Sequence, residues 1–429
     1  MQFGLFFPMQ LPRPWGPTAE SDLFQQSLAQ AEIADRIGIA YCWAQEHHFL
    51  EEYSHSSAPE VFLAAVSQRT RRLRLGHGVT LMPPTYNHPA RVAERIAALD
   101  LVSNGRVEWG TGESSSRLEL EGFRTSFVEK RSMWAEAVRQ TAIMMSSTPY
   151  PGFEGEYFSM PCRNVVPKPL QKPHPPLWVA CTNRDTMKLA ARLGIGALTF
   201  AFMDAKEAKF WVEEYYDIFT REVQPIGRAV NPNIAMLGGL MCNANDAVGR
   251  ARGLQGQEFF KWGLAHYYRF GRHQPGHTHL WETFMTSERE PMAGMVGVGG
   301  VAEVRERFEE LEEAGLDQVI LLHQAGQYRH EHITESLELF GESVLPGFRV
   351  RHLERAATKA ARLEPYIQGA LQSLPALPQM TEIPAVDSYP RLWKEAGVDT
   401  GMTAKRALEN AAMWKMHVSG AGSASTSEA

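Results

Sequence analysis

The chain has 429 residues, of which 44% are hydrophobic and 21% are charged, proportions close to those of ordinary globular proteins. The formal net charge is −6 and no run of Lys or Arg is longer than two residues, which argues against a nucleic-acid-binding surface. No apolar run approaches the roughly 20 residues that span a bilayer, and the N-terminus has no signal-peptide pattern. The four cysteines have no CxxC spacing, so we expect a cytoplasmic protein with reduced thiols and no membrane segment.

Hydrophobic periodicity predicts strands and helices that alternate along the first 345 residues. The predicted strands are 2–7, 40–44, 73–81, 106–110, 177–180, 197–200, 233–242 and 318–322. The predicted helices are 22–37, 59–69, 89–101, 131–146, 185–193, 205–223, 246–262 (interrupted by glycines), 301–314 and 332–344. Outside this repeat, residues 153–166 predict a hairpin, and residues 269–297, which show no period, predict a long loop or lid.

Eight strands that alternate with helices predict parallel strands covered on both faces, which is the α/β class. A doubly wound open sheet normally has a Gly-rich turn after its first strand, whereas this chain has PMQLP at 8–12. The sequence therefore predicts a (β/α)8 TIM barrel with insertions over residues 1–348. Residues 349–429 predict a C-terminal extension with helices at 352–371 and 404–417, and its last ~10 small, polar residues are expected to be disordered.

Two adjacent histidines follow the second predicted strand, where barrel side chains reach the catalytic end. They belong to the segment 43–49, WAQEHHF, and along an extended chain only one of His47 and His48 faces the pocket. A pocket imidazole beside a carboxylate suits a general acid or base, and a buried His bonded to a backbone carbonyl is the alternative. His77 and His88 are candidate metal ligands with His47, but no strand carries an HxH pair and no helix carries HExxH, so we expect no metal.

Two more segments at predicted strand ends are candidates for ligand contact. Residues 110–116, GTGESSS, allow close approach of a ligand but match neither a Walker loop nor GxGxxG. Residues 180–186, ACTNRDT, open a helix, where N–H groups and hydroxyls suit either a phosphate cradle or an ordinary N-cap. Basic residues near this segment would favour the phosphate cradle, and Arg131 and Arg184 are the candidates.

Several blocks, in order along the chain, carry a resemblance to a known family. They are FGLF at 3–6, AYCWAQEHHF at 40–49, LGHGVTLMPPTYNHP at 75–89, RVAERIAALDLVSNGRVEWGTG at 91–112, and the segments 176–194 and 299–348. Through them the chain resembles the bacterial luciferase-like family of flavin-dependent monooxygenases over residues 1–348.

This resemblance implies a TIM barrel that takes reduced FMN as a diffusible co-substrate from a separate NAD(P)H:flavin reductase. With O2, the flavin of such enzymes forms a C4a-peroxyflavin that oxygenates a small organic substrate. By position, the resemblance makes His47 the catalytic residue and implies a non-prolyl cis peptide between Gly78 and Val79 beneath the flavin. The cofactor-binding residues would be Gly78, Val79, Glu113, Arg131, Cys181, Thr182, Asn183 and Thr186, with Arg131 and the 182–186 turn at the phosphate. It also implies a homodimer.

The substrate pocket is expected to be lined by Trp262, His266, Tyr267 and Tyr268 with the 269–297 insertion, and helix packing is the alternative role of these aromatic residues. Glu113 stands where the family often has a phosphate-binding Arg. Because a carboxylate repels phosphate, we expect Glu113 to face the flavin ring, the substrate or an Arg. The cysteine near the flavin of luciferases is absent, so light emission is not expected. The alternatives are a deazaflavin-dependent oxidoreductase, a non-catalytic flavin-binding subunit, and a zinc-dependent barrel hydrolase.

Overall fold

The computed structural model describes residues 1–272, 274–378, 380–386 and 397. The chain forms two units, Met1–Pro378 and Gln379–Ala429, and most of the second unit lies outside the described residues. The helix predicted at 404–417 and the chain end predicted to be disordered also lie outside them. Within the described residues, no helix is both long enough and apolar enough to cross a membrane.

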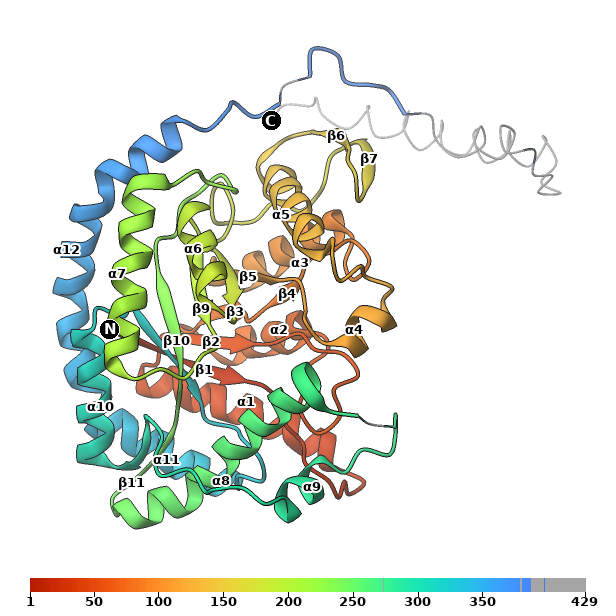
Figure 1. Ribbon diagram of the computed structural model, residues 1–429. Coiled ribbons are helices and arrows are strands. Elements are labelled where there is room, and N and C mark those ends of the chain that lie inside the picture. The colour runs from red at the N-terminus through yellow and green to blue at the C-terminus, as the bar shows by residue number, and fades with distance from the viewer. Residues whose placement is uncertain (273, 379, 387–396, 398–429) are drawn as a thin grey trace, which may run out of the picture. The chain divides into compact units, whose positions relative to one another are not determined.

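The first unit is built on a closed barrel of parallel strands (Figure 1). The barrel strands are β1 (Gln2–Phe7), β2 (Tyr41–Ala44), β3 (Arg74–His77) continued by β4 (Thr80–Leu81), β5 (Val107–Gly112), β8 (Leu177–Cys181), β9 (Gly196–Thr199), β10 (Ile234–Gly239) and β13 (Gln318–Leu322). Each strand pairs with two neighbours, and the β3–β5 and β1–β13 pairs close the ring. The predicted TIM barrel is confirmed.

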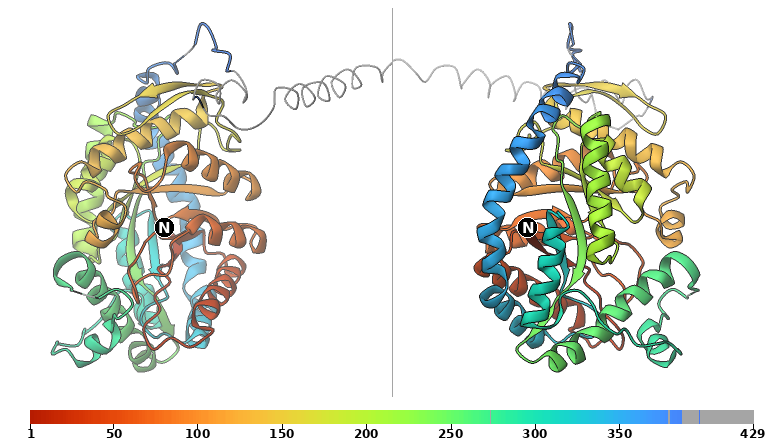
Figure 2. Two further views of the ribbon diagram at one scale, coloured as in Figure 1. Left: turned by 90° about the vertical axis from the view of Figure 1, so that its right-hand side faces the viewer. Right: turned by 60° about the vertical axis from the view of Figure 1, so that its left-hand side comes forward.

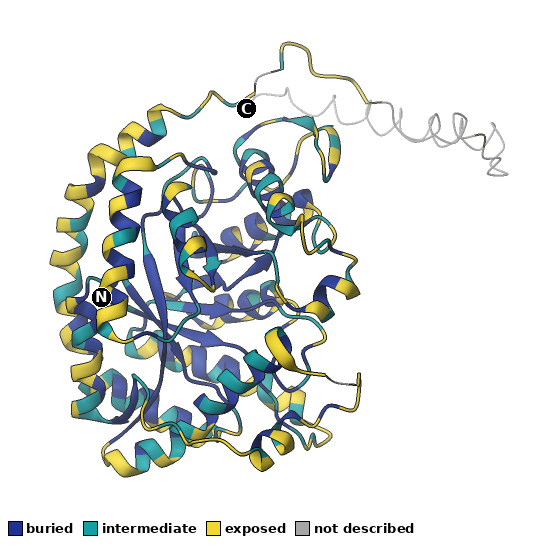
Figure 3. Ribbon diagram, in the orientation of Figure 1, coloured by how far each residue is buried: buried dark blue, intermediate teal, exposed yellow. Residues whose placement is uncertain are grey.

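Helices surround the strands, and Figure 3 shows buried strands inside helices that are exposed on their outer sides. The helices are α1 (Ala19–Ile37), α2 (Pro59–Arg69), α3 (Pro89–Val102), α4 (Arg117–Gly122), α5 (Lys130–Ser146), α6 (Arg184–Arg192), α7 (Ala205–Glu222), α8 (Asp246–Ala265), the π-helix η1 (His266–Phe270), α9 (Leu280–Thr286), α10 (Val301–Glu313), α11 (His330–Ser343) and α12 (Leu345–Gln372). The predicted hairpin is present as β6 (Tyr150–Glu154) and β7 (Ser159–Arg163). A second small sheet joins β11 (Met241–Asn243) to β12 (Val298–Gly300).

Four predicted elements were wrong in detail. The strand expected at 73–81 is broken at Gly78 and Val79, and the strand expected at 233–242 is two strands in two different sheets. The glycines of 246–262 do not interrupt α8. They allow this helix to pack closely against β12. A Cβ at Gly249 would lie 2.5 Å from the Gly299 carbonyl oxygen, and one at Gly253 would lie 2.6 Å from Val298. The predicted lid at 269–297 holds the end of η1 and all of α9.

The C-terminal extension contributes α12, which starts at Leu345, before the predicted boundary at 348. It runs along the outside of the unit beside α7 and α10 (Figure 2). Lys359 Nζ donates to Asn233 Oδ1 at 2.6 Å and to Asp317 Oδ1 at 2.7 Å, just ahead of β10 and β13. This part of α12 therefore lies at the N-terminal ends of the strands, away from the catalytic end of a TIM barrel.

Candidate active site

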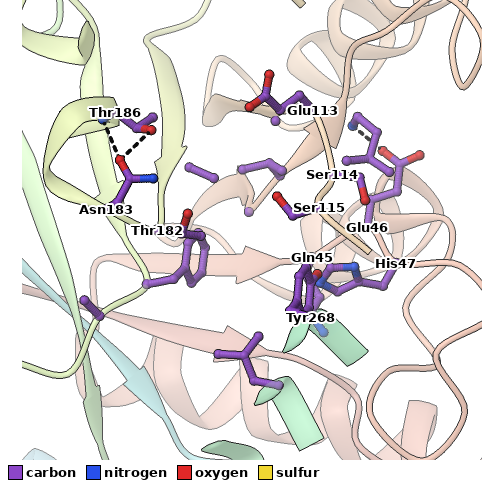
Figure 4. A pocket seen from close by; sticks show the side chains of 18 of the residues that line it. Gln45, Glu46, His47, Glu113, Ser114, Ser115, Thr182, Asn183, Thr186 and Tyr268 are labelled. Atoms are coloured by element: carbon purple, nitrogen blue, oxygen red, sulfur yellow. Dashed lines mark hydrogen bonds between the residues drawn. The ribbon is translucent and has the colours of Figure 1, made fainter. Parts of the chain in front are cut away.

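A cavity of about 740 Å³ opens at the carboxyl ends of the strands, within the size range of small-molecule sites. Its polar lining residues include Gln45, Glu46, His47, Glu113, Ser114, Ser115, Arg131, Thr182, Asn183, Thr186, Lys261 and Tyr268. Figure 4 shows Thr182, Asn183 and Thr186 on one side of the cavity and Glu46 and His47 on the other. The apolar lining includes Phe6, Val79, Leu81, Val179, Phe200, Phe202, Phe260 and Leu264. The cavity therefore has two polar ends joined by an apolar middle.

His47 is held at its end of the cavity by backbone and side chain together. Its N–H donates to the Ser56 carbonyl at 2.8 Å, which fixes the segment after β2. Its Nδ1 lies 2.9 Å from Glu119 Oε1, and the side chain is 16% exposed. The rings of Tyr53 and Tyr268 lie 5.7 and 6.4 Å from the imidazole. The imidazole of His47 is thus held in a fixed orientation at the cavity wall and remains accessible from the cavity.

Glu119, on the short helix α4, is fully buried. Its Oε1 also accepts the His48 N–H at 2.9 Å, and its other oxygen accepts the Ser114 hydroxyl. Burial alone raises the pKa of this carboxyl, but the charge and hydrogen bonds of His47, Ser114 and the His48 N–H hold the pKa below its ordinary value. An ionised carboxylate only accepts hydrogen bonds, so Nδ1 of His47 carries the proton and a neutral imidazole keeps Nε2 as its acceptor.

The second histidine points elsewhere, as expected for adjacent residues. His48 is outside the cavity lining, and its Nε2 lies 3.2 Å from Glu46 Oε1. The same carboxylate accepts the Leu81 N–H at 2.7 Å and the Asn87 side-chain amide at 3.0 Å. Glu46 thereby ties the chain after β2 to β4, which carries the cavity wall.

The peptide bond between Gly78 and Val79 is cis, as the resemblance implied. Both residues line the cavity between β3 and β4. A Cβ on the neighbouring Gly112 would lie 2.4 Å from Val79 Cγ2, so only glycine allows β5 to approach this closely. The apolar middle of the cavity is therefore built from the broken third strand and from β5.

The opposite end of the cavity presents donors suited to an anion. Asn183 is the N-cap of α6, with its Oδ1 accepting the Thr186 N–H at 3.0 Å, so the predicted N-cap and the predicted cradle are the same turn. Arg131 reaches this turn from α5, with Nη2 3.4 Å from Thr186 Oγ1. Glu113 faces this Arg, one of the three partners expected for it: its oxygens bind Arg131 Nε at 3.0 Å and Nη2 at 2.8 Å.

Four predicted site residues lie outside the cavity lining. Cys181 is fully buried, and burial raises the pKa of its thiol above its ordinary range. Trp262 and His266 stack on each other with ring centroids 5.6 Å apart, and the Tyr267 hydroxyl donates to the Glu51 carbonyl at 2.6 Å. The lining residues of α8 and η1 are Phe260, Lys261, Leu264, Ala265, Tyr268 and Arg269, of which Tyr268 was expected. The roles predicted for the four residues stay predictions.

Sequence reasoning missed Glu119 as the partner of His47 and Ser114 as a partner of Glu119. The signal available was an acidic residue between Leu118 and Leu120, an unusual place for a carboxylate unless it has a buried partner. The described residues contain no group of three or more His, Cys, Asp or Glu that could hold a metal. His88, one candidate ligand, accepts the Ala90 N–H at the start of α3 instead.

A family model described as luciferase-like monooxygenase matches residues 1–318. The chain belongs to this family. The flavin-dependent trigonelline monooxygenase, oxygenase component, of Acinetobacter baylyi is 29% identical over 200 residues, which are 45% of this chain and 52% of that protein. The crystal structure of monooxygenase RslO1 from Streptomyces bottropensis superposes with a TM-score of 0.67 at 26% identity, covering 81% of this chain and all of that one.

Another relative is named for a different cofactor. The F420-dependent hydroxymycolic acid dehydrogenase of Mycobacterium tuberculosis is 31% identical over 189 residues, which are 42% of this chain and 50% of that protein. The chain thus spans about half the length of both curated relatives. Membership of the luciferase-like monooxygenase family and the barrel fold agree with an oxidoreductase, whereas the relatives differ in cofactor.

Proposed function

We propose that this protein is a flavin-dependent monooxygenase that takes reduced FMN as a diffusible co-substrate and uses O2 to oxygenate a small organic molecule. The observation that carries the proposal is the pairing of His47 with the buried Glu119 at one end of a cavity whose other end presents anion donors. A phosphorylated cofactor fits this donor set: Arg131, Thr182 and Thr186 would hold its phosphate, and Val79 would contact its ring. Reduced flavin supplies the electrons that activate O2.

The chain's own residues then have separate tasks. The apolar walls, with Phe6, Val179 and Phe260, exclude water from the middle of the cavity. Nε2 of His47 exchanges a proton with the reacting groups, and Glu119 stabilises the imidazolium that forms. The relative described as an oxygenase component supports a separate NAD(P)H:flavin reductase as partner. A homodimer and a cytoplasmic location remain proposals, the first to be checked by light scattering.

A second candidate is a deazaflavin-dependent oxidoreductase, which the F420-dependent relative favours. Titration with reduced FMN and with reduced F420 separates the two, and tight binding of F420 alone would overturn the proposal. A non-catalytic flavin-binding subunit does not require His47 to be oriented by a buried carboxylate.

The proposal is tested by His47→Ala. Loss of a positioned acid–base group lowers turnover by ~10²-fold or more with flavin binding nearly intact. Wild-type turnover in this variant would contradict the catalytic role of His47, and failure of the native protein to bind any flavin would refute the proposed function.

A further inference from the structure

The arginine at the anion end of the cavity already holds an anion. Glu113 engages the Arg131 guanidinium as a fork, Oε2 on Nε at 3.0 Å and Oε1 on Nη2 at 2.8 Å. This is the bidentate geometry with which arginine also recognises phosphate. Nη2 has a third, longer contact of 3.4 Å to Thr186 Oγ1. The edge of Arg131 that a phosphate would use is therefore filled by a side chain of this chain.

A second cation, Lys130, is outside the cavity lining and also contacts the Glu113 carboxylate. Lys130 Nζ lies 3.5 Å from Glu113 Oε1 and donates to the Ser114 carbonyl and to Ser115 Oγ. Burial lowers the pKa of Lys130, while the charge of Glu113 opposes that effect. One carboxylate is thus shared by two cations, which leaves a net charge of +1 on the three side chains. A dianionic phosphate meets less attraction here than it would at two unpaired cations.

Further donors, all uncharged, come from the turn that starts α6. Thr182 and Thr186 line the cavity, and Asn183 Oδ1 is engaged by the Thr186 N–H and hydroxyl at 3.0 and 3.2 Å. These groups are neutral, so they orient an anion without compensating its full charge. The strength of the anion subsite is therefore decided by whether Arg131 is free.

We propose that Glu113 occupies the position of the cofactor's phosphate on Arg131, so that a phosphate gains this arginine only by displacing Glu113. The inference rests on the proposed function and specifies how the flavin is held. The phosphate contributes little to binding, so the flavin exchanges readily. It also makes Glu113 the residue that sets preference for phosphorylated over unphosphorylated flavin.

The test compares FMN with riboflavin, which lacks the phosphate, on native protein, Glu113→Gln and the control Glu121→Gln. Glu121 carries the same charge on α4, pairs with Arg117 and is outside the cavity lining. Anaerobic titration of the reduced flavins should show FMN binding at least ~10-fold tighter in Glu113→Gln, the size of one removed like charge, with riboflavin unchanged. Glu121→Gln should match native protein. FMN affinity that is unchanged or lower in Glu113→Gln would overturn the inference.

Inorganic phosphate gives a readout that needs no flavin. At equal ionic strength, phosphate should raise the melting temperature of Glu113→Gln more than that of native protein or Glu121→Gln. If no flavin binds to any variant while this phosphate effect appears, the proposed function fails and the role of Glu113 stands. No difference between variants in phosphate would refute the role of Glu113 directly. If Glu113→Gln does not fold, Glu113→Ser, which matches the following serines, takes its place in both arms.

Discussion

Glu119→Gln tests whether the buried carboxylate acts on His47 through its charge. Glutamine has nearly the same shape, and its carbonyl oxygen can take the Oε1 position, which accepts from His47 Nδ1 and from the His48 N–H. Its amide then faces Ser114 Oγ, whose hydroxyl can turn to accept. The substitution therefore removes a negative charge 2.9 Å from His47 Nδ1 and keeps the hydrogen-bonding geometry.

The expected loss follows from the energy of a charge-assisted hydrogen bond. Such a bond contributes about 1.5–3 kcal/mol. Since 1.36 kcal/mol corresponds to a tenfold change in rate, turnover should fall roughly 10- to 150-fold when His47 takes up a proton during the reaction. The loss should be smaller than that of His47→Ala, because the imidazole remains in place.

The assay is turnover with the reductase, reduced flavin, O2 and an oxygenated substrate, and Glu121→Gln on the same helix is the matched control. Glu121 pairs with Arg117 on the exposed side of α4, with a side chain 64% exposed. Turnover of Glu119→Gln equal to that of Glu121→Gln would refute a role for the Glu119 charge.

A second measurement needs no substrate. Because the pKa of Glu119 is lowered in the folded protein, its charge adds stability that is present above the unfolded value near 4.5 and is lost as the pH falls. The difference in unfolding free energy between native protein and Glu119→Gln should therefore be largest near neutral pH and shrink below pH 4.5. Urea unfolding at several pH values gives this difference, and a constant value would contradict the inferred charge.

Three further predictions concern residues away from the reacting groups. His48→Ala should lower the unfolding free energy by about 1–3 kcal/mol with turnover retained, because Glu46 loses a buried partner; urea unfolding and turnover check this. Glu52 accepts the N–H groups that start α9 and is fully buried, so Glu52→Gln should cost about 1.5–3 kcal/mol and speed limited proteolysis near α9. Burial lowers the pKa of His174 from 6.5 to about 4, so the unfolded chain binds more protons between these values. Stability should fall as the pH drops through this window, by up to ~1.4 kcal/mol per pH unit from this site, and less steeply in His174→Gln when followed by urea unfolding.

The barrel was predictable because its signal is repeated along the chain. Strands buried on both faces need continuous apolar segments, and each is followed by a helical period, so local patterns add up to one topology. The breaks in this pattern were not visible. Apolar residues alternate along 73–81 on both sides of the cis bond at Gly78, and residues 234–242 carry no charged or polar side chain while the chain passes from the barrel to the small sheet.

The candidate site was predictable only where it lies at strand ends. His47 and the turn before α6 follow β2 and β8 directly, so the barrel rule places them. Glu119 is 72 residues from His47 in the sequence, and no local pattern encodes a pair at that separation. The lining of α8 was misplaced because the helix passes its predicted end at 262 and continues into η1. Of the two adjacent tyrosines expected at the pocket, Tyr268 lines the cavity and Tyr267 does not.

Glu113 and Glu119 lie in the same connection between β5 and α5 and have opposite consequences. Glu119 is surrounded by donors, so its charge is stabilised and acts on the proton that His47 exchanges. Glu113 is paired with Arg131, so its charge offsets the attraction of this end for a phosphate. The two effects should therefore separate in kinetics: Glu119→Gln lowers kcat, whereas Glu113→Gln lowers the KM for FMN and leaves kcat nearly unchanged. The connection between β5 and α5 thus affects both the affinity for the cofactor, through Glu113, and the proton transfer, through Glu119. Flavin titration and turnover measurements distinguish the two residues.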